Sequence, residues 1–558
     1  MNQRNLIRIA FLVGPCMVSA ARGQTGAPNV SPGETGILLR QIAAAGQLAD
    51  LRWPNFSDYS THVQNFYQSA GYTLAWFHSG QPTSQAVSII GVLEKAATKG
   101  LDPEDYDGSR WTARLDRLRS ASESDLARFD AALTVCTMRY ISELHIGKVN
   151  PMYFHFGLDV EHQKYSLPDF LRQRLLNAPD PAAVLATVEP PFPGYQRTEV
   201  ALARYVDLAR QDDGQPLPAP AKTLAPGTPY EGVPRLTRLL RLLGDLPQDS
   251  ATDASTYDGA LVDAVKHFQR RHGLEPNGRL DAQTLKSLNT PLSSRVRQMQ
   301  LTLERWRWLP HEFDEPPIIV NIPEFHLRAY STEQEGPVSL QMNVIVGKAY
   351  GHKTPVFAGT MKYVVLRPYW NVPPSIQRSE IVTAVQKDRE YIAKKGFEVT
   401  THSGEVVTSG TISDEVLARL RAGTVEVRQK PGPSNALGLV KLIFPNTYNV
   451  YLHSTPAQEL FSRSRRDFSH GCIRVENPAE LTAWVLRNNE GWDLERVKQA
   501  MNGGKDNQQV NLAKTVPVLI VYGTAIVNEA GDALFFDDIY GLDADLEKVL
   551  AKGYPYPG

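Results

Sequence analysis

Cysteine is scarce in this chain, with three among 558 residues. An exported fold stabilised by disulfides normally carries more of them. Charge of one sign is also lacking, since the net charge is -1, and no long basic run indicates a nucleic-acid partner. Glycine and proline are interleaved with apolar residues, which excludes a disordered chain. The length predicts a soluble globular protein of about three or four domains.

Long hydrophobic runs are absent except near the N-terminus. There "MNQRNLIRIAFLVGPCMVSAARGQTGAP" places Arg4 and Arg8 before an apolar stretch over residues 9–21. This stretch is shorter than the ~20 residues that cross a bilayer. The pattern predicts a signal peptide over residues 1–23 and therefore an exported protein. Lipidation at Cys16 is the alternative, although Pro15 is a poor neighbour for it.

If the protein is exported, its two other cysteines, Cys136 and Cys472, meet an oxidising compartment. Cys136 lies in "DAALTVCTMRYISEL", where Ala132, Leu133 and Tyr140 share its helical face, so we expect a buried apolar thiol. A Cys136–Cys472 disulfide stays open. A free Cys472 would be a chemical liability in an oxidising compartment unless it has a function.

The residue pattern changes from helical to strand periodicity along the chain, which predicts a multidomain α+β fold. We expect a helical domain over residues 24–214, a proline-rich linker over 215–234 and a small helical domain over 235–292. Strand patterns dominate residues 306–545, with a mainly helical insertion at about 375–429 that could act as a lid. Residues 546–558 form a tail.

In the small helical domain the turn "EPNGRLD" places Asp281 where it can cap the helix that follows. Together with this turn, the domain has a set of characteristic positions, namely Ala264, Phe268, Gln269, Gly273, Leu274, Gly278, Thr284 and Leu288. In these positions it resembles the three-helix peptidoglycan-binding domain. A generic helical bundle is the alternative, and ligand contacts stay open even if the fold is right.

The segment "YLHSTPAQELFSRSRRDFSHGCIRVENP", residues 451–478, contains Cys472 and two histidines. A thiol becomes nucleophilic when an imidazole takes its proton or when positive charge lowers its pKa. Gly471 permits a tight turn whose amides can face an oxyanion, and Arg474 supplies a fixed charge. His453 comes from another predicted strand and can approach the sulfur, so we predict His453 as the base, oriented by a backbone carbonyl. His470, two residues from Cys472, is expected to shape the pocket.

Two other interpretations compete. His453, His470 and Cys472 would suffice for a catalytic zinc site, but no CxxC or HExxH pattern supports a metal, and none is expected. Cys472 could also be an inert core thiol. Against that, the segment contains many charged side chains, namely Arg463, Arg465, Arg466, Asp467 and Arg474.

The pattern "HSTP…LF…RRDFSHGCIRVENP" resembles the signature of YkuD-type L,D-transpeptidases. The similarity extends to "VIVGKAYGHKTPVF", "YWNVPPSI", "KPGPSNALGLVKLIFPN" and "YGTAIVNEAGD", and to the order of domains in the large Gram-negative members. Ser454 departs from the Asp or Gly that is frequent there. The resemblance implies a periplasmic cysteine acyltransferase without a cofactor. It also implies a donor pocket lined by Tyr451, Ser469, His470 and Arg474, with Ser454 nearby, and capped by the insertion.

By this resemblance, Cys472 attacks a tetrapeptide stem of peptidoglycan, D-Ala leaves, and an amine of a second stem resolves the thioester. The expected partners are therefore donor and acceptor stem peptides, with peripheral association at the inner membrane left open. The sequence also leaves open an L,D-carboxypeptidase that uses water, and a lipoprotein lysine or a 1–3 linkage in place of 3–3 crosslinks. A wall-binding scaffold with a dead site is disfavoured by the intact set His453, Gly471, Cys472 and Arg474.

Overall fold

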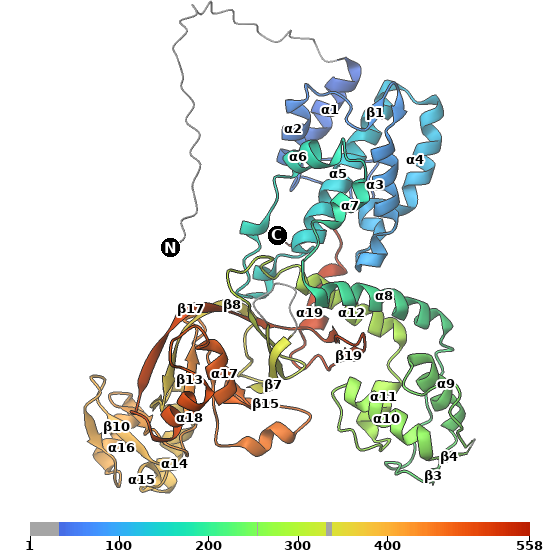
Figure 1. Ribbon diagram of the computed structural model, residues 1–558. Coiled ribbons are helices and arrows are strands. Elements are labelled where there is room, and N and C mark those ends of the chain that lie inside the picture. The colour runs from blue at the N-terminus through green and yellow to red at the C-terminus, as the bar shows by residue number, and fades with distance from the viewer. Residues whose placement is uncertain (1–32, 254, 331–337, 558) are drawn as a thin grey trace, which may run out of the picture.

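The computed structural model of the protein describes residues 33–557, apart from residues 254 and 331–337. The predicted signal peptide and Cys16 lie outside the described residues. Within them, no helix is both long and apolar enough to cross a membrane. A helical domain, a small helical domain and a β-rich domain with a projecting lobe follow each other along the chain (Figure 1).

The N-terminal helical domain is built around one long buried helix, α5, which begins with a capping box. The Ser122 hydroxyl accepts from the Asp125 amide at 3.2 Å, and the Asp125 carboxylate accepts from the Ser122 amide at 2.9 Å. Cys136 lies on α5 with no exposed surface, as predicted. The elements are α1 (Glu34–Ala45), α2 (Ser60–Ser69), β1 (Phe77–His78), β2 (Gln81–Pro82), α3 (Ser84–Glu94), α4 (Trp111–Arg117), α5 (Glu123–Ile146), α6 (Leu167–Phe170) and α7 (Pro181–Ala186).

A second apolar core joins the small domain to two flanking helices. The helix α8, which the sequence pattern places in the first domain, also packs along α12. Asp281 caps α11 as expected, since its carboxylate accepts from the Thr284 amide at 2.7 Å. The elements are α8 (Pro193–Gln211), β3 (Thr228–Pro229), α9 (Val233–Leu243), β4 (Thr256–Tyr257), α10 (Gly259–Arg271), α11 (Ala282–Leu288) and α12 (Leu292–Trp306).

The β-rich domain centres on a mixed sheet, which in the described part of the chain has nine strands in the order β15-β7-β16-β14-β13-β8-β17-β5-β6. Its main strands are β5 (Ile318–Asn321), β6 (His326–Tyr330), β7 (Val338–Gly347), β8 (Phe357–Leu366), β13 (Val440–Ile443), β14 (Leu452–His453), β15 (Asp467–Ser469), β16 (Ile473–Val475) and β17 (Gln508–Val521). The helices α17 (Pro478–Val485), α18 (Leu494–Gly503) and α19 (Leu542–Leu550) and the hairpin β18 (Ala525–Val527) and β19 (Ala533–Phe535) complete it.

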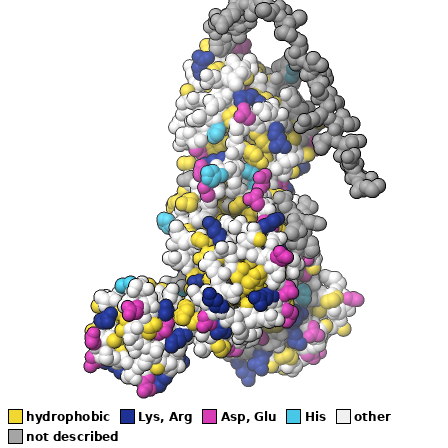
Figure 2. All heavy atoms as spheres, turned by 60° about the vertical axis from the view of Figure 1, so that its left-hand side comes forward, with side chains coloured by type: hydrophobic (Ala, Val, Ile, Leu, Met, Phe, Trp, Pro, Cys, Tyr) yellow, Lys and Arg dark blue, Asp and Glu magenta, His cyan; other side chains and the backbone are white. Residues whose placement is uncertain are grey.

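The insertion forms a cap that projects from the body as a separate lobe (Figures 1 and 2). Besides the predicted helices it contains a small sheet of order β11-β10-β12-β9, so it is less helical than the sequence pattern suggests. The elements are β9 (Trp370–Asn371), α13 (Pro374–Ile376), a π-helical turn (Gln377–Ile381), α14 (Val382–Lys387), α15 (Tyr391–Lys394), β10 (Phe397–Thr400), β11 (Val406–Thr408), α16 (Asp414–Ala422) and β12 (Glu426–Gln429).

Residues near the end of the chain return to the first domain. The Tyr556 hydroxyl donates to the Asp105 carboxylate at 3.2 Å, and the Asn150 amide donates to the Pro557 carbonyl at 3.1 Å. The Arg139 guanidinium lies 4.4 Å from the centre of the Tyr554 ring. The segment after α19 is therefore part of the helical domain's packing.

Candidate active site

Strand pairing brings the predicted site residues to one face of the large sheet. In the pairing of β13 with β14, Lys441 lies opposite His453, and in that of β14 with β16, His453 lies opposite Arg474. Residues directly opposite each other share a face, and so do residues two apart on one strand. The face that carries His453 therefore also presents Tyr451 and, just before β16, Cys472.

The turn that carries the sulfur requires glycine. Gly471 has φ +113°, a backbone conformation that side chains rarely adopt. The Thr354 hydroxyl donates to the Gly471 carbonyl at 2.8 Å and accepts from the Gly347 amide at 2.9 Å. A Cβ on Gly347 would lie 3.0 Å from Cα of Gly471 and closer still to the His352 carbonyl oxygen. Two glycines and one threonine thus fix the turn against β7.

The Ser469 hydroxyl is hydrogen-bonded to one of the two backbone amides, those of Gly471 and Cys472, that could face an oxyanion. Its hydroxyl donates to the Cys472 carbonyl at 2.5 Å and accepts from the Gly471 amide at 3.1 Å. Within the described residues the Cys472 amide makes no hydrogen bond. The Cys472 amide is therefore the one left for a developing oxyanion.

His453 is buried, with 5% of its surface exposed, and one of its ring nitrogens is fixed. The expected contact with a backbone carbonyl is present, because Nδ1 donates to the Ser454 carbonyl at 2.6 Å. A carbonyl only accepts, so Nδ1 carries the proton and Nε2 keeps a lone pair. Burial, helped by the charge of Arg474, lowers the pKa of His453 to about 3. The imidazole is thus neutral at physiological pH and able to accept a proton.

The Cys472 thiol is partly buried and neutral at rest. Burial raises its pKa, while hydrogen bonds from Tyr451 and the charges of Lys441 and Arg474 oppose that rise. Its Sγ lies 3.7 Å from the Asn449 carbonyl oxygen, to which it donates. The resting site therefore holds a neutral thiol and a neutral imidazole rather than a thiolate–imidazolium pair.

Two cations flank these groups without a carboxylate partner. Among the described residues, neither Lys441 nor Arg474 forms an ion pair, and Nε of Arg474 is buried without a hydrogen-bond partner. Burial lowers the pKa of both side chains. Sequence reasoning missed Lys441, whose sole signal is a charged residue inside the apolar strand "LVKLIF". Unpaired cations in a partly buried site favour an anionic ligand.

His470 contacts the cap. Its Nε2 lies 2.7 Å from the carboxylate of Glu380, on the π-helical turn of the cap, and its ring packs 4.7 Å from that of His352. The structure thus brings together Cys472, Gly471, Ser469, Tyr451, His453 and Arg474, with His470 at the cap side. The Ser454 side chain packs against Gly438 instead, and it is the Ser454 carbonyl that contacts His453. Over the described residues, no group of three or more His, Cys, Asp or Glu side chains is arranged to hold a metal ion.

Three segments of the chain match models of known domain families. Residues 61–202 match a scaffold domain, residues 230–288 match a domain described as "Putative peptidoglycan binding domain", and residues 316–518 match the L,D-transpeptidase catalytic domain. A Haemophilus influenzae protein named "Putative L,D-transpeptidase" is 31% identical over 282 residues. The matched region is 49% of this chain and 55% of that protein, so the chain spans about half the length of this curated relative.

Proposed function

Because residues 316–518 match the model of the L,D-transpeptidase catalytic domain, we propose that the protein is a peptidoglycan L,D-transpeptidase that acts through a Cys472 thioester. The observation that carries the proposal is the shared sheet face on which Cys472, the neutral His453 and two unpaired cations meet. The peptidoglycan-binding-like domain supports the same substrate. A wall polymer as substrate places the enzyme outside the cytoplasm, in the periplasm by the sequence resemblance.

In the first half of the reaction, Sγ of Cys472 attacks the carbonyl carbon of the third residue of a tetrapeptide stem. The thiol proton passes to Nε2 of His453 as the S–C bond forms. The Cys472 amide stabilises the oxyanion. The C–N bond to the terminal D-Ala then breaks, and the leaving amine takes the proton from His453. A thioester and free D-Ala result.

In the second half, an amine of another stem attacks the thioester carbonyl. His453 removes a proton from that amine, and the thiol is regenerated as the new amide bond forms. An acceptor amine gives a crosslink, whereas water would give a tripeptide. The cap, which reaches the site through Glu380 and His470, favours a reaction shielded from water.

The two cations fit the charge that enters the site. The resting thiol and imidazole are both neutral, so among the described residues the positive charges of Lys441 and Arg474 are not balanced within the site. The terminal carboxylate of the donor stem is the anion that enters it. We therefore place that carboxylate between Lys441 and Arg474.

Incubating the protein with a disaccharide tetrapeptide and measuring the products by mass spectrometry tests the proposal. We expect dimers and free D-Ala, both absent with Cys472→Ala. Tripeptide without dimer would show that the protein is an L,D-carboxypeptidase rather than a crosslinking enzyme. Fragmentation of the dimers distinguishes 3–3 from 1–3 linkages, and a lysine-bearing lipoprotein peptide as acceptor tests the third alternative.

A further inference from the structure

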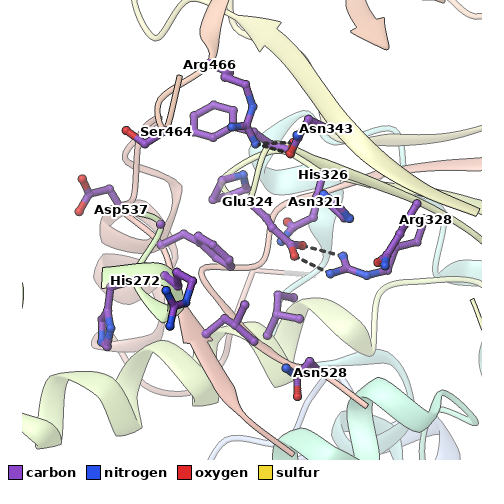
Figure 3. A pocket seen from close by; sticks show the side chains of 18 of the residues that line it. His272, Asn321, Glu324, His326, Arg328, Asn343, Ser464, Arg466, Asn528 and Asp537 are labelled. Carbon is purple, nitrogen blue, oxygen red and sulfur yellow. Dashed lines mark hydrogen bonds and ion pairs between the residues drawn. The ribbon is translucent and has the colours of Figure 1, made fainter. Parts of the chain in front are cut away.

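A polar cavity of about 1160 Å³ lies away from the Cys472 sulfur, between the small helical domain and the β-rich domain (Figure 3). One wall is the turn after α10, around His272 and Leu274, and the opposite wall is formed by β6, β7 and the loop that precedes β15. The hairpin β18–β19 and the end of α12 close the remaining sides. Its volume exceeds that of most small-molecule sites, which are about 300–1,000 Å³.

The walls of this cavity are fixed to each other. Arg271 of α10 pairs with the fully buried carboxylate of Asp245 and donates to the Ala533 carbonyl of the hairpin at 2.8 Å. At Gly273 the two walls meet, since a Cβ there would lie 3.0 Å from the Phe536 ring. The small domain is therefore anchored to the catalytic domain, and the cavity is a built feature rather than a gap between mobile parts.

The inner surface carries an ordered set of polar side chains. Glu324, whose side chain is 7% exposed, accepts two hydrogen bonds from Arg328 at 2.6 and 2.8 Å. Nearby, Arg466 donates to the Asn343 side chain at 3.0 Å, and both pairs lie side by side in Figure 3. Arg466 donates most of its other N–H groups to the backbone carbonyls of Phe325, Val344 and Arg463. Nδ2 of Asn343 and Nε of Arg328, both residues of the lining, make no hydrogen bond among the described residues. They are preorganised to bind a neutral ligand with many hydrogen-bonding groups.

The composition of the lining selects the class of ligand. Arginines are mixed with Glu275, Glu529 and Asp537 around the opening, so the cavity is no site for one strong anion. Half-buried aromatic rings of Trp306 and Tyr330 add flat apolar faces. Hydroxyl and acetamide groups on apolar ring faces are the chemistry of amino-sugar polymers. We propose that this cavity binds the glycan strand of peptidoglycan. The identity of this polymer rests on the proposed function.

Two strands connect this cavity to the nucleophile. Asn343, which lines it, and Gly347, which touches the Gly471 turn, lie four residues apart on β7, or roughly 13 Å at the rise of an extended strand. The lining loop also runs directly into β15, where Ser469 contacts Cys472. A glycan strand in the cavity would thus hold its stem peptides close to the catalytic cysteine.

Binding is tested by calorimetry on the Cys472→Ala protein, with glycan strands stripped of stem peptides and with a neutral N-acetylglucosamine hexamer. We expect both to bind. Gln283→Trp and Ser464→Trp place bulk on opposite sides of the opening, at exposed positions where folding should survive. Each should weaken binding at least tenfold. Ala282→Trp, on the neighbouring exposed position of α11 outside the lining, is the matched control and should not.

Activity gives an independent measure. Gln283→Trp and Ser464→Trp should lower crosslinking of intact wall strands about tenfold, with crosslinking of a sugar-free tetrapeptide unchanged. Absence of sugar binding, or binding that the two tryptophans leave intact, would overturn the glycan site. Equal loss on both substrates would overturn it too. Failure of the transpeptidase proposal is distinguishable, because the wild-type protein would then bind glycan without forming any dimer.

Discussion

Lys441 lies directly opposite His453 across β13 and β14, with its ammonium nitrogen 4.9 Å from the centre of the Tyr451 ring. The strand register places a cation beside the predicted base without a carboxylate among the described residues to neutralise it. The arrangement costs solvation free energy unless an anion arrives.

Replacing Lys441 by Gln should therefore weaken use of the donor carboxylate. A charge-assisted hydrogen bond contributes about 1.5–3 kcal/mol, so kcat/KM for acylation should fall about 10- to 100-fold. For a donor whose terminal carboxylate is converted to an amide, Lys441→Gln should change kcat/KM little. Lys441→Arg should recover part of the carboxylate preference. An equal fall in kcat/KM for both donors would contradict this assignment. It would mean that the charge of Lys441 acts on the thiol alone.

The raised pKa of Cys472 predicts slow alkylation at neutral pH. The thiolate fraction falls when the pKa rises, so iodoacetamide should label native Cys472 more slowly at pH 7 than free cysteine, whose pKa is about 8.5. The rate should rise with pH beyond that value, and Lys441→Gln should slow it further because a stabilising charge is lost. Cys136, fully buried with a raised pKa, should stay unlabelled until the protein unfolds.

Acylation by the donor should show a different pH dependence. The pKa of His453 is lowered to about 3, so the imidazole stays unprotonated above that value and loses its base function only when pH falls toward it. The acylation rate between pH 5 and 8 should therefore show no inflection near 6.5, the value of an ordinary histidine. Such an inflection would mean that the pKa of His453 is close to that of an ordinary histidine and is not lowered by burial.

The orientation of His453 depends on the backbone of Ser454 and not on its side chain. His453→Gln should lower acylation by about 10²–10⁴-fold, the range that a general base contributes. Ser454→Gly keeps the carbonyl that receives the hydrogen bond from Nδ1 and should retain most activity. Mass spectrometry of the acyl-enzyme measures both. An active His453→Gln protein would point to His470 as the next candidate.

The Glu380–His470 contact predicts how firmly the cap is seated. Glu380→Gln removes the charge and should speed hydrogen–deuterium exchange several-fold in residues 374–387. Glu390→Gln changes an exposed carboxylate of the same lobe, paired with Lys394, and is the matched control. Unchanged exchange in Glu380→Gln would show that the apolar packing of the cap alone sets its position.

Local sequence pattern and family resemblance were enough to predict several features of the fold and the site. Domain order, the buried Cys136, the Asp281 cap and the backbone partner of His453 follow from short segments and are confirmed. The catalytic roles of Cys472 and His453 stay predictions, although the sheet brings the two residues to one face. The positions that it missed depend on contacts between distant segments. Glu380 meets His470 across 90 residues, and Lys441 enters the site through a strand register that periodicity does not specify.

Domain boundaries illustrate the same limit. The apolar stripe of α8 predicts a helix, but it does not say which partner the stripe will bury against, and α12 lies about a hundred residues later in the chain. The cap's small sheet was missed for a related reason. Its strands are short and separated by helices, so their pairing leaves no alternating pattern long enough to recognise.

The return of Tyr554 and Tyr556 to the helical domain has a consequence for biogenesis. The ribosome makes these residues after everything from α1 to α19. Until they arrive, Arg139 and Asp105 lack their contacts with Tyr554 and Tyr556, although the rest of their domain has already been made. The first domain to emerge is thus among the last to be finished, and a chain interrupted before residue 554 would leave it open to proteases.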